Sequence, residues 1–198
     1  MPEGRDQSGE GSIDPGGVPP GRGVLYISGA KLCFMLAGYA IAFGLPRLLD
    51  SIELYGRFGV VNRAVSVLNM VMIGGTIQAV SRFVSAEPER AGAVAGLALR
   101  LQLLLGVAVA AAYALASPLL ARLLGDPGLA GLMRLSAIII ACYAVYAALV
   151  GSINGRRLFH RQAFLDVLFS TVKAALMLGA AALGLGVAGA IGGFAATA

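Results

Sequence analysis

Three positively charged side chains lie inside apolar stretches of this sequence that are long enough to form membrane helices. They are Lys31, Arg100 and Lys173. A lysine or arginine at the centre of a membrane helix costs about 2.5–3.5 kcal/mol on insertion scales, so three oppose insertion by roughly 8–10 kcal/mol unless something compensates. Such groups usually face a water-filled cavity and mark a substrate or ion path. The chemistry they predict is anion binding within the membrane.

The elements that must position these cations are apolar helices. Because crossing about 30 Å of hydrocarbon takes about 20 mostly apolar residues, we searched for runs of that length. Five are found, at residues 24–45, 60–83, 93–117, 131–152 and 164–185. A sixth apolar run, 187–198, is too short to cross, and we expect the chain to be the amino-terminal piece of a larger protein. With 58% hydrophobic and 13% charged residues, the sequence predicts an all-α membrane bundle of five complete helices and a partial sixth.

The ends of the predicted spans indicate how the chain is oriented. Residues 1–23 contain seven Gly and four Pro with few apolar side chains, which predicts a disordered tail before the bundle of residues 24–198. The segment "GRRLFHR", between the fourth and fifth spans, is the densest basic cluster. Since basic residues are enriched in cytoplasmic loops, we expect a multi-pass protein of the cytoplasmic (inner) membrane with a cytoplasmic amino terminus.

The three intramembrane cations are predicted to lie at one level. Lys31 and Arg100 are seven residues after the start of their spans, and Lys173 is nine residues after the start of its span. The first, third and fifth helices run in the same direction, so these side chains lie about 10–14 Å from the cytoplasmic edge. The alternative is that the long side chains reach the headgroups by snorkelling.

Polar residues form stripes beside these cations. In the second span the stripe consists of Asn62, Ser66, Asn69 and Thr76, with Arg63 on an adjoining face. Either hydrogen bonding between helices or a hydrated cavity explains it. In the fifth span, Asp166 is two turns (about 10.5 Å) from Lys173 and too far to pair with it. The lysine therefore needs water or an anionic ligand as its partner.

Small residues predict where helices approach closely. Gly74 and Gly75 lie in the second span, and Gly189 and Gly193 form a GxxxG spacing near the end of the chain. Helices in membranes use such residues to bring their backbones together.

Two stretches resemble a known family. They are "LYGRFGVVNRAVSVLNMVMIGGTIQAVSRFVS" and "SINGRRLFHRQAFLDVLFSTVKAALMLGAAALGLGVAGAIGGFAA". Over residues 24–198 the chain is similar to polysaccharide biosynthesis proteins of the oligosaccharide flippase type, in the multidrug/oligosaccharidyl-lipid/polysaccharide exporter superfamily. The resemblance implies a carrier of twelve or more helices in two lobes, of which this chain is most of the first and the carboxy-terminal lobe is missing. Cationic cavities are typical of the family, and the matching positions are Lys31, Arg63, Arg100 and Lys173.

The resemblance favours one function over the others. The carrier would move a polyprenyl-pyrophosphate-linked oligosaccharide, a polysaccharide repeat unit, across the membrane by alternating access while the prenyl tail stays in membrane lipid. In this hypothesis the pyrophosphate is attracted by Lys31, Arg100 and Lys173. Sugar hydroxyls are bound by Asn62, Ser66 and Asn69.

Three alternatives remain. A multidrug exporter of the same superfamily normally needs a buried carboxylate, whereas the first span carries Lys31 instead. An integral membrane transferase or polymerase would need clustered catalytic groups, but the acids are dispersed and have no metal-ligand spacing, so we expect no enzyme activity, metal or cofactor. A non-transporting subunit or truncated remnant is the third. The net charge of +5 comes from scattered Lys and Arg, which argues against nucleic acid as a partner.

Overall fold

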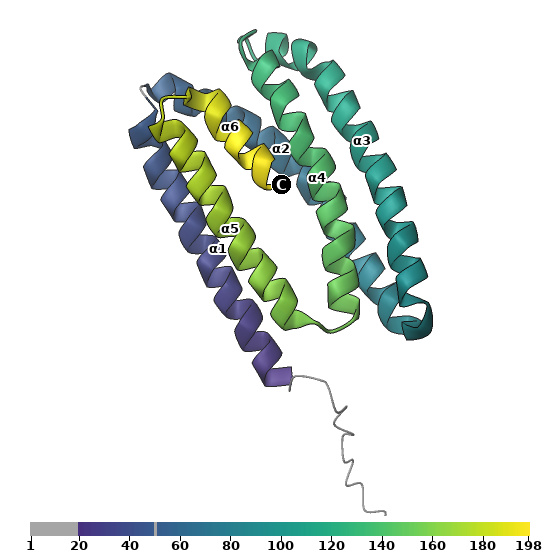
Figure 1. Cartoon of the computed structure of the whole chain (residues 1–198). Helices are drawn as coiled ribbons and strands as arrows, with labels where there is room; N and C mark the ends of the chain where they lie inside the picture. The colour runs from purple at the N-terminus through teal and green to yellow at the C-terminus, as the bar shows by residue number, and fades with distance from the viewer. Residues whose placement is uncertain (1–19, 50) are drawn as a thin grey trace, which may run out of the picture.

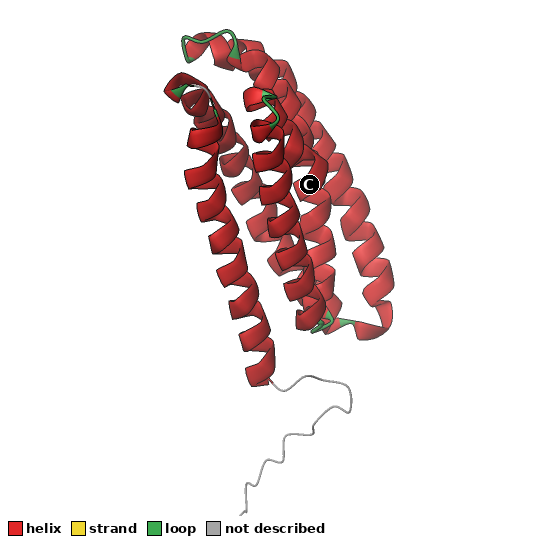
Figure 2. Cartoon of the chain, turned by 60° about the vertical axis from the view of Figure 1, so that its left-hand side comes forward, coloured by secondary structure: helices red, strands yellow, loops and turns green. Residues whose placement is uncertain are grey.

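The computed structural model describes residues 20–49 and 51–198, and it is a bundle of helices (Figure 1). The elements are α1 (Pro20–Leu48), α2 (Ile52–Ala86), the 3-10 helix η1 (Pro88–Arg90), α3 (Ala91–Leu123), α4 (Leu129–Gly155), α5 (Phe159–Ala182) and α6 (Gly186–Thr197). Figure 2 shows helices joined by short loops throughout this part of the chain. Five helices are long and apolar enough to cross a membrane, and α6 is shorter. The predicted fold class is confirmed.

The helices begin and end at residues with clear local reasons. Ser51 caps α2, since its extended backbone lets the side-chain oxygen accept a hydrogen bond from the Leu54 N–H at 3.2 Å. Pro88, at the start of η1, prevents α2 from continuing. Gly125 and Gly184 adopt a φ of +75°, the left-handed conformation that ends α3 and α5 at low cost.

The helix limits differ from the predicted spans mainly at their ends. Each of the first four long helices contains its predicted span completely. The fifth, α5, begins five residues before the predicted span 164–185 and ends three residues before the end of that span. Of the predicted tail, residues 1–23, the first 19 residues lie outside the part of the chain that the structure describes. Residues 20–23, placed in that tail by composition, instead form the first turn of α1.

The helices pack in two sets. α4 packs against α2 and α3, α1 packs mainly against α5, and α6 contacts α5, α4 and α2. We call these the α2–α3–α4 group and the α1–α5 pair. In Figure 1, α1, α3 and α5 all run from the lower end to the upper end, as the sequence predicted. The shared core includes Leu45, Val61, Ile140 and Met177, each almost completely buried. Most exposed large side chains are apolar, which suits contact with lipid.

Close contacts occur at two of the four predicted glycines, Gly189 and Gly193, and also at Gly151, which was not predicted. A Cβ at Gly151 of α4 would lie 2.8 Å from the Val80 Cβ of α2, and a Cβ at Gly193 would lie 2.7 Å from the Leu176 carbonyl oxygen. By contrast, a Cβ at Gly74 or Gly75 would meet nothing within 4 Å. The prediction for Gly74 and Gly75 was therefore wrong, because this face of α2 has no neighbouring helix in the described chain.

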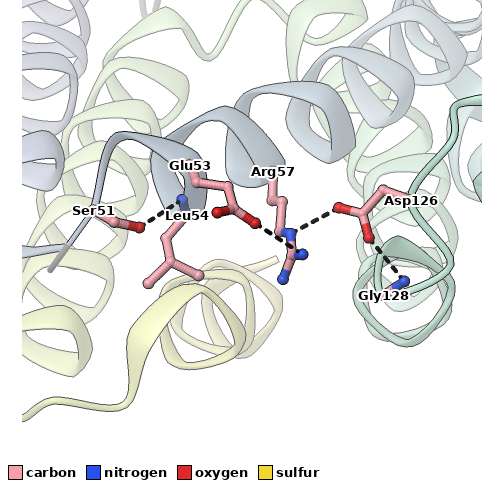
Figure 3. Close-up of polar contacts among 6 residues, drawn as sticks. All are labelled: Ser51, Glu53, Leu54, Arg57, Asp126 and Gly128. Atoms are coloured by element: carbon pink, nitrogen blue, oxygen red, sulfur yellow. Dashed lines mark hydrogen bonds and ion pairs between the residues drawn. The ribbon is translucent and has the colours of Figure 1, made fainter.

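An ion-pair network ties α2 to the α3–α4 loop at the upper end of the bundle (Figure 3). The Arg57 guanidinium contacts Glu53 at 3.0 Å and Asp126 at 2.7 Å. The second oxygen of Asp126 accepts a hydrogen bond from the Gly128 N–H at 2.9 Å. The loop is thereby fixed to the start of α2.

Candidate functional site

Lys173 lies at the contact of three helices, surrounded by aromatic rings. Its ammonium nitrogen is 4.9 Å from the ring centre of Phe194, 5.1 Å from that of Phe34 and 5.7 Å from that of Phe169. These rings come from α6, α1 and α5, and the side chain is half-buried. We call Phe34, Phe169 and Phe194 the aromatic cage of Lys173.

No carboxylate compensates this charge within the part of the chain that the structure describes. The ion pairs there join Arg57 to Glu53 and Asp126, and Arg90 to Glu87. A cation over an aromatic face gains about 0.5–2 kcal/mol, so three rings offset much of the insertion cost of about 2.5–3.5 kcal/mol. From the sequence we expected water or an anion as the partner of Lys173, and the structure adds three aromatic rings. Ring faces, however, leave the three N–H donors without an oxygen acceptor.

Asp166 has a partner of its own. The Tyr146 hydroxyl of α4 donates a hydrogen bond to the Asp166 Oδ1 at 2.5 Å. This agrees with the prediction that Asp166 is too far along α5 to pair with Lys173.

Aromatic contacts in the same region connect α4 to α5 and to α6. Tyr143 of α4 meets Phe169 and Phe194 edge to face, with ring centres 5.7 and 5.9 Å apart. Tyr146 stacks on Phe169 at 5.8 Å. We call Tyr143, Tyr146, Phe169 and Phe194 the aromatic junction. It joins the α2–α3–α4 group to the α1–α5 pair, and two of its rings belong to the cage of Lys173.

The other predicted cations are exposed. Lys31 lies on α1, Arg63 on α2 and Arg100 on α3. α1 packs against the helix of Lys173, but α3 contacts neither α1 nor α5 among the described residues, so the structure does not bring Arg100 beside the two lysines. Measured from their helix starts, Lys31, Arg100 and Lys173 lie about 17, 14 and 21 Å along the axes. Their role in binding stays a prediction.

The predicted polar residues of α2 lie in different surroundings. Asn62 lines a cavity of about 10 Å³ together with Ser136 of α4 and Phe194 of α6, which is room for about one water molecule. Ser66 is exposed, and its hydroxyl donates to the Asn62 carbonyl at 2.7 Å. Asn69 is buried, and its side-chain oxygen has no hydrogen-bond partner in the described chain. Asn69 therefore needs a water or ligand donor, because a buried polar atom is rarely left unpaired.

A family model described as "Polysaccharide biosynthesis protein" matches residues 45–194, which is more than half of the chain. The chain belongs to this family. No curated protein and no solved structure matches it. The family membership confirms the resemblance found in the sequence and indicates a role in polysaccharide biosynthesis or export for this multi-pass membrane protein. The match includes Asn62, Arg100 and Lys173, whereas Lys31 precedes it.

One polar residue of this polysaccharide biosynthesis protein was missed by sequence reasoning. Gln102 of α3 is 6% exposed, and its amide nitrogen donates to the Thr76 hydroxyl at 2.9 Å and to the Met72 carbonyl at 3.3 Å. It joins α3 to α2. For Thr76 the structure therefore supports hydrogen bonding between helices, one of the two explanations of the stripe. A glutamine within a mostly apolar span, two residues after Arg100, was the available signal.

Proposed function

We propose that this chain is part of a carrier that moves a polyprenyl-pyrophosphate-linked oligosaccharide across the cytoplasmic membrane by alternating access, with its amino terminus in the cytoplasm. Membership of the polysaccharide biosynthesis family gives the substrate class its main support. The reaction requires binding and release within the membrane, so the proposed chain is a carrier and not an enzyme. A second lobe in the complete protein would supply the opposite wall of the path.

The observation that carries the proposal is the setting of Lys173. Its ammonium lies inside a span and close to where the two helix sets meet, and its three N–H donors have no oxygen acceptor among residues 20–49 and 51–198. A pyrophosphate offers the oxygen acceptors and the negative charge that this position lacks. The aromatic cage holds the cation in place without neutralising it.

The remaining predicted residues extend this role. In the proposal, Lys31 on the neighbouring α1 and the exposed Arg63 and Arg100 attract the anionic substrate on its way to Lys173. The sugar hydroxyls are bound by Asn62, Ser66 and Asn69. Of these three, Asn69 has the strongest physical reason to bind a donor, because its buried oxygen is unpaired in the described chain.

The test is a transport assay with the full-length protein in liposomes. The substrate is a polyprenyl-pyrophosphate oligosaccharide with a fluorescent sugar, and its transfer is followed by the access of a membrane-impermeant quencher. Lys173→Met keeps an unbranched side chain one atom shorter that can still contact the rings, but it removes the charge. We expect initial rates to fall about tenfold to a hundredfold, because a hydrogen bond to a charged group contributes about 1.5–3 kcal/mol.

The controls separate charge from folding. Lys173→Arg should retain most of the activity. Arg122→Gln, an exposed arginine on α3, a helix that contacts neither α1 nor α5 among the described residues, should retain all of it. A wild-type rate for Lys173→Met would remove the proposed role of this residue. Efflux of a cationic dye by the same liposomes, with no movement of the lipid-linked sugar, would favour the multidrug exporter instead.

A further inference from the structure

A second cavity is lined by residues at the α2–α3 and α4–α5 connections. Both connections lie at the lower end of the bundle in Figure 1. Its volume is about 610 Å³, within the range of small-molecule sites. It is lined by Val84, Ser85, Pro88, Ala91, Gly92, Gly155, Arg156 and Arg157. None of these residues belongs to the surroundings of Lys173, so the cavity is separate from the site proposed above.

Glycine contacts bring the walls of this cavity together. A Cβ at Gly155 would lie 2.7 Å from the Val84 Cβ and 2.8 Å from the Ser81 carbonyl oxygen. The last turn of α4 therefore lies directly on the end of α2, and the chain leaves α4 with two consecutive arginines at the cavity wall. Arg157 has a φ of +58°, a left-handed conformation that costs a residue with a side chain about 1–2 kcal/mol.

The charged groups that line the cavity are two arginine side chains that can bind an anion. Arg156 and Arg157 are exposed, and their guanidinium groups make no ion pair or hydrogen bond within the described chain. The nearest acids in sequence to the lining are Glu87 and Glu89, of which Glu87 contacts Arg90 at 3.9 Å. Neither acid lines the cavity. Two guanidinium forks beside an open space are suited to an anion with several oxygens, and phosphate is the common case.

The position of the cavity relative to the membrane indicates where the phosphate comes from. α2 has 35 residues, a length of about 50 Å, while the hydrocarbon core is only about 30 Å thick. The helix must therefore extend beyond the hydrocarbon core on at least one side, and the cavity lies at one of its ends. Phe83 and Phe164 are exposed near the same end, so apolar surface suited to contact with lipid lies beside the cavity.

We propose that this cavity binds the phosphate headgroup of an anionic phospholipid, held by Arg156 and Arg157. The site does not depend on the transport function. It fixes the ends of α2, α3 and α4 to a lipid at one face of the membrane. The same guanidinium chemistry would accept a water-soluble phosphate, and the experiment below separates the two sources.

The test measures the dissociation constant of added phosphatidylglycerol for the full-length protein in neutral detergent by native mass spectrometry, with phosphatidylcholine as the neutral comparison. We expect phosphatidylglycerol to bind more tightly than phosphatidylcholine. Arg156→Gln and Arg157→Gly should each weaken the preference about fivefold, and the double variant about 30-fold, since a basic residue near an anionic surface contributes about 1 kcal/mol. Arg122→Gln at the opposite end should leave it unchanged.

Arg157→Gly also guards against a folding artefact. Glycine adopts the left-handed conformation without strain, so this variant should unfold at the same or a higher temperature than the wild type. An unchanged preference for phosphatidylglycerol in the stable double variant would overturn the proposal. If inorganic phosphate displaced the lipid at equal concentration, or bound equally well without it, the lipid assignment would be wrong.

Discussion

Replacing Gly151 by alanine tests whether α2 and α4 are held together by backbone contact. A Cβ at this position would lie 2.8 Å from the Val80 Cβ, 3.2 Å from the Val80 Cγ1 and 3.2 Å from the Ile77 carbonyl oxygen. The Val80 Cβ and the Ile77 carbonyl oxygen are fixed by the backbone of α2 and cannot rotate away. Non-bonded carbon atoms normally pack at about 3.5–4.0 Å, so these contacts are too short. The two helices must therefore separate by roughly 1 Å.

The expected cost follows from two opposing effects. Overpacking of a close contact costs about 1–3 kcal/mol, while alanine in place of glycine gains about 0.5–1 kcal/mol in a helix. Gly151→Ala should therefore lower the free energy of unfolding by about 0.5–2 kcal/mol. Gly131→Ala is the matched control in the same helix, because a Cβ there meets nothing within 4 Å. That variant should be as stable as the wild type or slightly more stable.

The measurement is reversible unfolding in mixed micelles, followed by helical circular dichroism for the wild type and the two variants. The two substitutions are chemically identical and lie in one helix, so their difference reports the contact and not the propensity. Equal stability of Gly151→Ala and Gly131→Ala would show that α4 does not lie against α2 as described.

Three further predictions concern polar contacts. Gln102→Leu should lower the free energy of unfolding by about 0.6 kcal/mol, and at most about 1.7 kcal/mol, in the same unfolding assay, because hydrogen bonds between membrane helices contribute little more. Asp126→Asn should cost about 0.2–1 kcal/mol at low salt, and high salt should reduce the difference, since its ion pair with Arg57 is partly exposed. Tyr146→Phe keeps the aromatic stacking but removes the donor to Asp166, so near-ultraviolet circular dichroism should stay close to that of the wild type while thermal stability falls.

Hydropathy was sufficient to predict the bundle but not its helix contacts. The spans follow from the length of apolar runs, which a bilayer requires, whereas helix ends depend on local features such as the Ser51 cap. Gly151 was not predicted as a close contact and Gly74 was, since the sequence does not reveal which helix faces which. The tertiary packing of the helices determines which of their faces contact one another.

The candidate site was only partly predictable for the same reason. Lys173 could be selected from the sequence because a charge within an apolar run is unusual and costly. Two of its cage residues, Phe34 and Phe194, come from other helices, and no spacing in the sequence connects them to it. Arg100 was selected by the same reasoning, yet its helix contacts neither α1 nor α5 in the described chain.

The kind of partner that holds Lys173 has a consequence for the proposed transport. A carboxylate at this position would form a buried ion pair, and removing one partner of such a pair costs about 3–5 kcal/mol. A substrate phosphate would have to compete with that acid for the ammonium. Aromatic rings instead attract the cation by about 0.5–2 kcal/mol each and can remain in contact while an anion binds from another side. The cage therefore stabilises the lysine in the membrane and leaves its hydrogen-bond donors free, which is what reversible binding of a pyrophosphate requires.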